Sequence, residues 1–449
     1  MNGFRTRTTG LGHFNANQPF GNNPFINVPA DVNRNPFRLV MLDLGFVIRL
    51  RKLLVKIILP MGPLISGPLD ELYPSTSNLK DLALHTILLV TQIMLLSSLP
   101  VLAVLFWLVP GVVPILFLIA FWIATWTFMR LLNGAPTTEC LVGLPEGLEP
   151  VNNEHELWFF INGVATGKNW LQSNLDLLAR TFQREIVGIH NTTYGFLFDL
   201  LECLIQRDLD YKSRDIRQGR AQIRAALAAP ATKKLVLILH SQGGIEGSSI
   251  LDWLLADMSH EVIGKLEIFT FGNAARHFNN PLVSKPSSPL VDESKGARGE
   301  RVIKYIEQQV VLAIAISYLL GVSGVFYCQN YANTEDFVAN LGVLSFTSPK
   351  AQPFADGNAF FGSVYTREGP GHLLNMHYLD KMFTMVNGQV DEDGNSFMNS
   401  LIPSRNSRED VNDPSQRKMI KDVSRLWQYR NGRKPVDEVG VPPIRPTPP

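Results

Sequence analysis

The feature that most constrains this chain is a run of 44 consecutive residues, 86–129, without Asp, Glu, Lys, Arg or His. The hydrocarbon core of a bilayer takes about 20 apolar residues per helical crossing, so the run has the length of two helices. Pro110 and Gly111 lie near its middle, where a tight turn between antiparallel helices is expected. A helix of a soluble protein keeps a polar face, which this run lacks. The sequence therefore predicts a two-helix membrane hairpin over residues 83–132.

The region before the hairpin, residues 1–82, is polar and amphipathic. Its first 30 residues lack a basic segment followed by an apolar one, so we expect no cleavable secretory signal. Two interpretations stay open for residues 45–60: an amphipathic segment on a lipid surface, or an ordinary solvated helix face. The segment carries four cations, Arg49, Arg51, Lys52 and Lys56. Positive charge before a two-pass hairpin predicts that both flanking regions lie on the cytoplasmic side.

Charge and cysteine content narrow the classes of partner. Lys and Arg number 41 against 40 Asp and Glu, which leaves a net charge of +1 and no basic field for nucleic acid. Cys140, Cys203 and Cys328 lie far apart without a CxxC pair, which argues against a zinc site or a disulfide framework. We therefore expect no metal and no cofactor, and an apolar partner.

After residue 140 short strand-like runs alternate with helical stretches, a pattern typical of a mostly parallel sheet with helices on both faces. We predict this α/β domain over residues 145–388. The polar, Pro-rich residues 389–449 predict a mobile tail with one short helix near 418–429. The expected strands are 157–163, 185–191, 234–241, 265–273 and 301–307, and the expected helices are 169–182, 196–207, 216–229 and 245–258.

The segment 234–258 reads as a strand, a sharp turn and a helix, which is the order of a nucleophile elbow. Ser241 at the turn is the expected nucleophile, and Gly243 supplies the small residue two positions later. Leu239 occupies the position at which the GxSxG pattern has its first glycine. A bulky side chain at that position must point away from the turn or widen it. An ordinary strand-to-helix turn without catalytic function is the alternative.

A tetrahedral intermediate needs hydrogen-bond donors for its oxyanion. The backbone N–H of Gln242, directly after Ser241, is the first candidate. The second donor is expected in the loop after the first central strand, INGVATG, at Gly163 or Val164. A glycine-containing turn that binds no ligand is the alternative interpretation of that loop.

A serine nucleophile also needs a base and an acid, which follow it in the order acid, then histidine, in hydrolases with this elbow. His372, after a glycine in a loop, is the expected base among the nine histidines, and His377 is the alternate, with a structural role as its simpler interpretation. Asp336 is the expected acid, with Glu335 as its fallback. The acid would fix the tautomer of the histidine and stabilise its protonated form.

Six long motifs lie between residues 150 and 385: WFFINGVATG, NWLQSNLDLLARTF, GIHNTTYGFLFDLLECLIQRD, LILHSQGG, TFGNAARHFNNP and GHLLNMHYLD. In these motifs the chain resembles a group of fungal α/β-hydrolase-like proteins of the lipase or serine-esterase type. The resemblance covers roughly half of the chain. It implies an α/β-hydrolase domain with Ser241, Asp336 and His372 at the triad positions, and it implies no particular substrate. Some members of this broad superfamily lack activity, and Leu239 leaves that alternative open here.

Residues 309–329 are uncharged and long enough to cross a bilayer. A crossing would place Asp336 and His372 on the other side of the membrane from Ser241. Three interpretations stay open: a hydrophobic lid over the site, a crossing in a non-catalytic protein, and a sequence artefact. Deleting the segment joins the expected strand 301–307 to the loop that carries Asp336. We therefore hypothesise that residues 309–329 are translated from an unspliced intron, which a peptide from the native protein spanning them would contradict.

Two functions of different classes follow from these observations. The first is a membrane-tethered serine hydrolase that cleaves a carboxylic ester, with a lipid ester as the expected substrate. The second is a catalytically inactive hydrolase-fold protein that serves as a membrane scaffold or binds a partner. Either would be an integral protein of the endoplasmic reticulum or another internal membrane, with the α/β domain on the cytoplasmic side.

Overall fold

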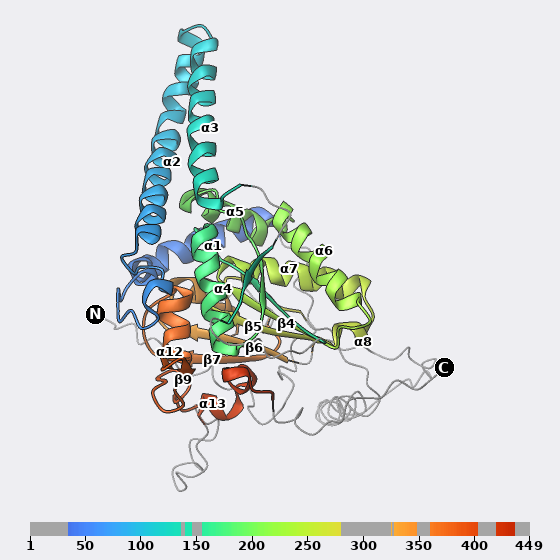
Figure 1. The fold of residues 1–449 in the computed structure, drawn as a ribbon. Coiled ribbons are helices and arrows are strands. Elements are labelled where there is room, and N and C mark those ends of the chain that lie inside the picture. Colours follow the sequence, from blue (N-terminus) through green and yellow to red (C-terminus); the bar gives the residue numbers. More distant parts are fainter. Residues whose placement is uncertain are drawn as a thin grey trace, which may run out of the picture.

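The structure of the chain, a computed structural model, describes residues 35–135, 140–145, 155–279, 325, 327–347, 360–402 and 419–435 (Figure 1). The expected strand 301–307 and most of the segment 309–329 lie outside the described residues. The helices that precede the sheet are α1 (Pro36–Leu50), η1 (Arg51–Ile57), η2 (Gly67–Leu69), α2 (Thr76–Leu108) and α3 (Val112–Asn133). The later helices are α4 (Lys168–Phe182), α5 (Phe196–Asp208), α6 (Arg214–Ala228), α7 (Gln242–Asp257), α8 (His260–Ile263), α10 (Phe337–Leu341), α11 (Val343–Thr347), η3 (Leu374–Leu379), α12 (Asp380–Met382), α13 (Ile420–Val423), α14 (Arg425–Gln428) and η5 (Arg430–Gly432).

Helices α2 and α3 form the expected hairpin, which projects away from the rest of the molecule (Figure 1). The turn between them lies at residues 109–111, as the Pro-Gly pair predicts. Both helices are long and apolar enough to cross a membrane by length and composition. Helix α2 begins seven residues before the predicted start, because the Ser75 side chain accepts a hydrogen bond from the backbone N–H of Asn78 and caps the helix there.

The sheet has seven strands in the order β1-β3-β2-β4-β5-β6-β7. Strand β1 pairs antiparallel with β3, and all the other pairs are parallel. Four of the expected strands are confirmed, as β2, β3, β4 and β5. On the side away from β4, strand β5 pairs with β6, which includes the last three residues of the segment 309–329. The bounds are β1 Leu141–Gly143, β2 Glu156–Ile161, β3 Ile186–Ile189, β4 Lys234–His240, β5 Leu266–Phe271, β6 Tyr327–Asn333 and β7 Ser363–Arg367, with a separate pair β8 (Met385–Val386) and β9 (Gln389–Val390).

Helices cover both faces of the sheet, and the alternation of side chains along each strand gives each face its own core. On β4, Leu237 and Leu239 belong to the core beneath α6 and α7, whereas Val236 and Ile238 belong to the core beneath α4 and η3. All four are essentially inaccessible to solvent. The mostly parallel α/β architecture expected from the sequence is therefore present.

The prediction of a mobile tail after residue 388 is wrong for the described residues of that region. Leu426 and Tyr429 are 0% exposed and lie in the same core as β4 and α4. The Arg425 guanidinium pairs with the Glu267 carboxylate on β5 at 2.8 Å, and the Tyr429 hydroxyl donates to the same carboxylate. The prediction failed because residues after 388 are mostly polar, and the few apolar ones among them pack on one face of the sheet.

The N-terminal strap, as we call residues 36–65, packs on the α/β domain instead of standing free before the hairpin. The Asp43 carboxylate of α1 is 2% exposed and pairs with Arg207 at 3.1 Å and with Arg276 at 2.8 Å. The Phe46 ring lies edge-on to that of Phe346 on α11, with 6.4 Å between the ring centroids. The boundary predicted at residue 82 therefore does not separate a structural unit.

Candidate active site

The site lies at the carboxyl ends of the parallel strands, where the order of the sheet reverses. The chain passes from β2 to β3 on one side of β2 and then returns to β4 on the other side. At such a reversal the loops that follow two neighbouring strands diverge and leave room for a ligand. Gly163 follows β2 and Ser241 follows β4, so both loops of this reversal carry residues expected in the site.

Ser241 adopts a backbone conformation that a residue with a side chain rarely takes, with φ of 57°. The strain is held by neighbouring backbone, since the Ser241 N–H donates to the Phe271 carbonyl and the Ser241 carbonyl accepts from Gly244. A Cβ atom at Gly243 would lie 2.4 Å from the Ile161 carbonyl oxygen, so the helix approaches β2 closely only with glycine there. The strand, turn and helix expected from the sequence are present.

Leu239 points away from the turn, which is the first of the two outcomes that the sequence allowed. Its side chain is 0% exposed and packs against α7. A Cβ atom at Gly247 would lie 2.3 Å from Leu239 Cδ1, so the missing side chain at Gly247 makes the space for Leu239. The tight turn is retained without the first glycine of the pattern.

The structure brings Ser241, His372 and Asp336 together, although they lie far apart in the chain. The Ser241 hydroxyl lies 2.9 Å from His372 Nε2, and His372 Nδ1 lies 2.8 Å from Asp336 Oδ2. All three side chains are buried. A membrane crossing by residues 309–329 would prevent this contact.

The Asp336 carboxylate is held from four directions. Its Oδ1 accepts the backbone N–H groups of Val338 and Ala339, and its Oδ2 accepts the Tyr378 hydroxyl at 2.6 Å as well as His372. Burial alone would raise the pKa of Asp336, but the charge of His372 and these hydrogen bonds outweigh burial and hold the pKa below its usual value. An ionised acid requires His372 Nδ1 to carry its proton, which leaves Nε2 free to accept one from Ser241.

The alternate residues His377 and Glu335 have other partners. His377 Nδ1 accepts the backbone N–H of Leu373 at 3.0 Å, so its Nε2 carries the proton and donates to the Pro60 carbonyl at 2.8 Å. The Glu335 carboxylate pairs with Lys56 at 2.6 Å. Neither residue contacts Ser241 or His372 through these bonds, and His377 instead ties the strap to the loop that carries His372.

Of the expected oxyanion donors, Gly163 and Gln242 lie beside the serine. A Cβ atom at Gly163 would be 2.5 Å from Ser241 Cβ, so this loop touches the nucleophile and tolerates only glycine. Gln242 is the first residue of α7, and a backbone N–H at that position has no acceptor within its own helix. Val164 is half-buried, and its carbonyl accepts the Thr166 hydroxyl at 3.2 Å.

Asp199 on α5 fixes the loop of Gly163, a role that sequence reasoning missed. Its carboxylate accepts the backbone N–H of Ala165 at 2.8 Å, the Thr193 hydroxyl at 2.6 Å and the backbone N–H of Tyr194 at 2.6 Å. Ala165 itself has φ of 52°, a left-handed conformation that these bonds stabilise. Burial raises the pKa of Asp199 to about 6. The run HNTTYGFLFD contains these residues, but their contact with the loop depends on the fold.

The hairpin also reaches this network. The Gln92 amide of α2 donates to the Tyr194 carbonyl at 2.6 Å, and the Asn133 amide at the end of α3 donates to the Thr193 carbonyl at 2.8 Å. The two apolar helices are thus hydrogen-bonded to the segment whose side chains and backbone hold Asp199.

His240, directly before the serine, is a second residue that sequence reasoning missed. Its ring stacks on that of His372 with 4.8 Å between the centroids, and its Nε2 donates to the His372 carbonyl at 2.9 Å. Burial, aided by the nearby His372, lowers the pKa of His240 to about 3, so the ring is neutral at physiological pH. His240 therefore orients His372 without adding charge beside it.

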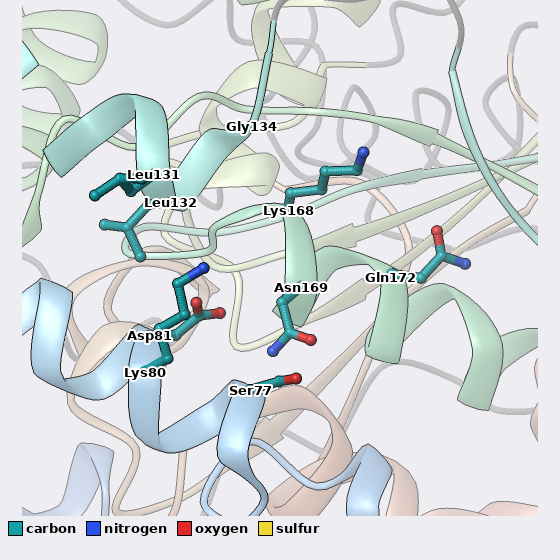
Figure 2. Close-up of a pocket in the computed structure, with 9 residues that line it drawn as sticks. All are labelled: Ser77, Lys80, Asp81, Leu131, Leu132, Gly134, Lys168, Asn169 and Gln172. Atoms are coloured by element: carbon teal, nitrogen blue, oxygen red, sulfur yellow. The ribbon is translucent and has the colours of Figure 1, made fainter. Parts of the chain in front are cut away.

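A pocket of about 300 Å³ lies at the base of the hairpin, between the start of α2, the end of α3 and the start of α4 (Figure 2). Its polar lining includes Lys80, Lys168 and Asn169, and its apolar lining comes from Leu131 and Leu132. The pocket contains none of the residues around Ser241. Within the described part of the chain, no cluster of three His, Cys, Asp or Glu side chains has the arrangement of a metal site.

Comparison with known proteins finds no matching family model, no matching curated protein and no matching solved structure.

Proposed function

We propose that this chain is a membrane-tethered serine hydrolase that cleaves a carboxylic ester, with Ser241 as nucleophile, His372 as base and Asp336 as acid. The observation that carries the proposal is the continuous set of hydrogen bonds from the Ser241 hydroxyl through His372 to Asp336, at 2.9 Å and 2.8 Å. A serine is a weak nucleophile without such a base. The strained conformation of Ser241 adds to the argument, because strain of this kind concentrates at functional sites.

The reaction follows from the positions of these groups. Ser241 Oγ attacks the acyl carbon while its proton passes to His372 Nε2, and Asp336 stabilises the resulting imidazolium. The backbone N–H groups of Gln242 and of the Gly163 loop donate to the oxyanion. The C–O bond of the ester then breaks, and the leaving alcohol takes the proton from His372. Water attacks the acyl-enzyme by the same route, which releases the acid and restores the serine.

The order of the sheet supports assigning the domain to the α/β-hydrolase class. The proposed nucleophile follows β4, the acid follows β6 and the base follows β7, the last strand of the sheet. This is the chain order of the triad in that class. The same triad order is what the resemblance proposed from the sequence motifs implies. A lipid ester is the expected substrate because the hairpin would keep the site close to a bilayer.

The second candidate is a catalytically inactive scaffold of the same fold. One observation favours it, since Ser241 is only 2% exposed and a substrate must displace whatever covers it. The two candidates differ in whether Ser241 reacts, which makes them separable by direct labelling of the serine.

Fluorophosphonate labelling of membrane fractions tests the proposal. We expect labelling of the native chain, none of Ser241→Ala, and a loss of about 10³-fold or more in the rate for His372→Gln. His377→Gln is the matched control, because it removes a buried histidine five residues away and should retain most of the labelling. Equal losses in both histidine variants would contradict the assignment of the base. An unlabelled but folded native chain would favour the scaffold.

The same assay bears on the intron hypothesis. Deleting residues 309–329 joins Gln308 to Asn330, so that Gln308 replaces Gln329, whose side chain bonds to Tyr365 and to the Val423 carbonyl. Stronger labelling of the deleted chain would support the hypothesis. A native peptide that spans the segment would refute it.

A further inference from the structure

Helix α1 exposes an apolar face that a helix of a soluble protein would bury. Phe37, Met41, Leu44 and Ile48 follow one another at helical spacing, and they are 72%, 53%, 44% and 64% exposed. The buried residue of the helix is the acid Asp43, which faces two arginines of the domain. A helix normally turns its apolar face to the core and its charges to water. The inward face of this helix carries Asp43 and the half-buried Phe46, and a second apolar face is left uncovered.

The exposed apolar surface continues along the rest of the N-terminal strap. Large apolar side chains are exposed throughout η1 and the segment after it. A contiguous surface of this kind marks a site of interaction with a protein or a membrane. The exposed members are Leu54, Val55, Ile58, Leu59, Met61 and Ile65.

The strap lies at the base of the hairpin, on the side from which the hairpin projects (Figure 1). Helix α5, which packs against both α1 and α2, adds exposed Leu200 and Leu201 beside it. The exposed apolar residues of the strap therefore lie next to the base of the apolar hairpin. If the hairpin spans a bilayer, the strap lies at the surface of that bilayer.

Basic side chains lie at the same level of the molecule. The strap carries exposed Arg38, Arg49 and Arg51 among its apolar residues. Lys80 and Lys168 flank the pocket at the hairpin base (Figure 2). Cations beside exposed apolar residues suit the boundary between anionic headgroups and acyl chains.

The strap is also fastened to the proposed catalytic loop. The Ile57 carbonyl accepts the backbone N–H of His372 at 3.3 Å, and the Pro60 carbonyl accepts His377 Nε2 at 2.8 Å. Lys56 pairs with Glu335, next to the proposed acid. The inner side of the strap thus lies against the residues that carry the site, and its outer side is the apolar surface.

We propose that the strap is a second membrane-contacting surface, which inserts its apolar face into the leaflet at the base of the hairpin. This holds the proposed catalytic edge of the sheet against the bilayer, so that an acyl lipid reaches Ser241 from the leaflet instead of from water. The statement about substrate rests on the proposed function. The membrane contact itself does not, and it is tested without reference to activity.

The experiment places a bimane fluorophore at one introduced exposed cysteine at a time in the full chain, reconstituted in nanodiscs of zwitterionic and anionic phospholipid. Ile48→Cys and Val55→Cys report on the strap, in a Cys140→Ser background whose unsubstituted form serves as the blank. Val386→Cys is the matched control, because Val386 is 50% exposed and lies on β8, which pairs with β9 at the end opposite the hairpin (Figure 1). Spin-labelled lipid and aqueous iodide serve as the two quenchers.

We expect the strap positions to be quenched several-fold more by spin-labelled lipid than Val386, and less by iodide. Quenching of all three positions by iodide alone would overturn the proposal. Protection of the strap from both quenchers would also overturn it, since a protein partner or a second copy would then cover the strap. Fluorophosphonate labelling of the same reconstituted chains, with Ser241 intact, separates the outcomes: an inserted strap on a folded chain that is never labelled would defeat the proposed function alone. Melting temperatures of the labelled variants establish that each is folded.

Discussion

The hairpin and the sheet differ in where they place apolar side chains. Strand β4 turns Leu237 and Ile238 inward, whereas α2 buries Asn78 and Gln92 beside Leu88 where it meets the domain. The apolar residues of α2 point outward along most of its length, Ile93 among them. Both arrangements satisfy the same rule, because apolar surface avoids water and polar groups seek partners. The difference is the one we expect of a sheet domain in water and a hairpin in lipid.

The sharpest way to break this comparison is to place one acid in each region. Ile238→Asp puts a charge into a fully buried strand, and we expect it to reduce the free energy of unfolding by more than about 4 kcal/mol. Ile93→Asp, at a position 49% exposed, should leave the unfolding of the domain in detergent unchanged. Instead, the free energy of membrane insertion of the hairpin should become less favourable by about 3 kcal/mol. Denaturant unfolding and carbonate extraction measure the two effects. Equal destabilisation in detergent would show that the hairpin is an ordinary packed element.

The second test concerns the ion pairs that fasten the strap to the domain. Asp43→Ala removes the buried carboxylate that Arg207 and Arg276 share and leaves Arg276 paired with Asp208 alone, so we expect a loss of about 3 kcal/mol in unfolding free energy. Asp257→Ala is the control, since this acid pairs with Arg220 at a partly exposed site and should cost under about 1 kcal/mol. Denaturant unfolding in detergent measures both. A negligible effect of Asp43→Ala would mean that the strap does not pack as described.

The third test lies where the two regions meet. Asp199→Asn replaces an acceptor of three hydrogen bonds with a group that also carries donors, so the loop of Gly163 should lose its position. We expect the rate of fluorophosphonate labelling at Ser241 to fall by about 10- to 100-fold. Asp176→Asn on α4, which bonds only to Gln172 among the described contacts, should leave the rate unchanged. A similar decrease in both variants would assign the effect to general destabilisation.

The smallest expected effect is on the pH dependence of stability. Burial, with the charges of Asp199 and Asp215, raises the pKa of Glu202 on α5 from 4.5 to about 7. The folded chain thus binds this proton more tightly than the unfolded chain, and stability should decrease as the pH rises from 4.5 to 7. Glu202→Gln should flatten that decrease by on the order of 1 kcal/mol, after allowance for partial exposure. Unfolding of both chains across this pH range measures the difference, and parallel pH profiles would contradict the raised pKa.

Signals in the sequence predicted the two hairpin helices, helices α4 to α7, four strands, the hairpin turn and the residues that meet at Ser241. The helices, strands and turn depend on nearby residues, whereas the triad was predicted from the chain order of serine, acid and histidine. The role of Asp199 and the stacking of His240 on His372 were beyond such reasoning, because both depend on contacts between distant segments. The same limit explains why the tail was expected to be mobile, although Leu426 and Tyr429 complete a face of the sheet.

The exchange of space between Leu239 and Gly247 has a consequence for how related chains are found. A search that demands glycine two residues before the serine passes over this chain, although the turn it is meant to detect is intact. The relevant constraint is the summed volume of two side chains, one on β4 and one on the facing turn of α7. Relatives are expected to vary in a correlated way at these positions, either a large residue before the serine with glycine six residues after it, or the reverse.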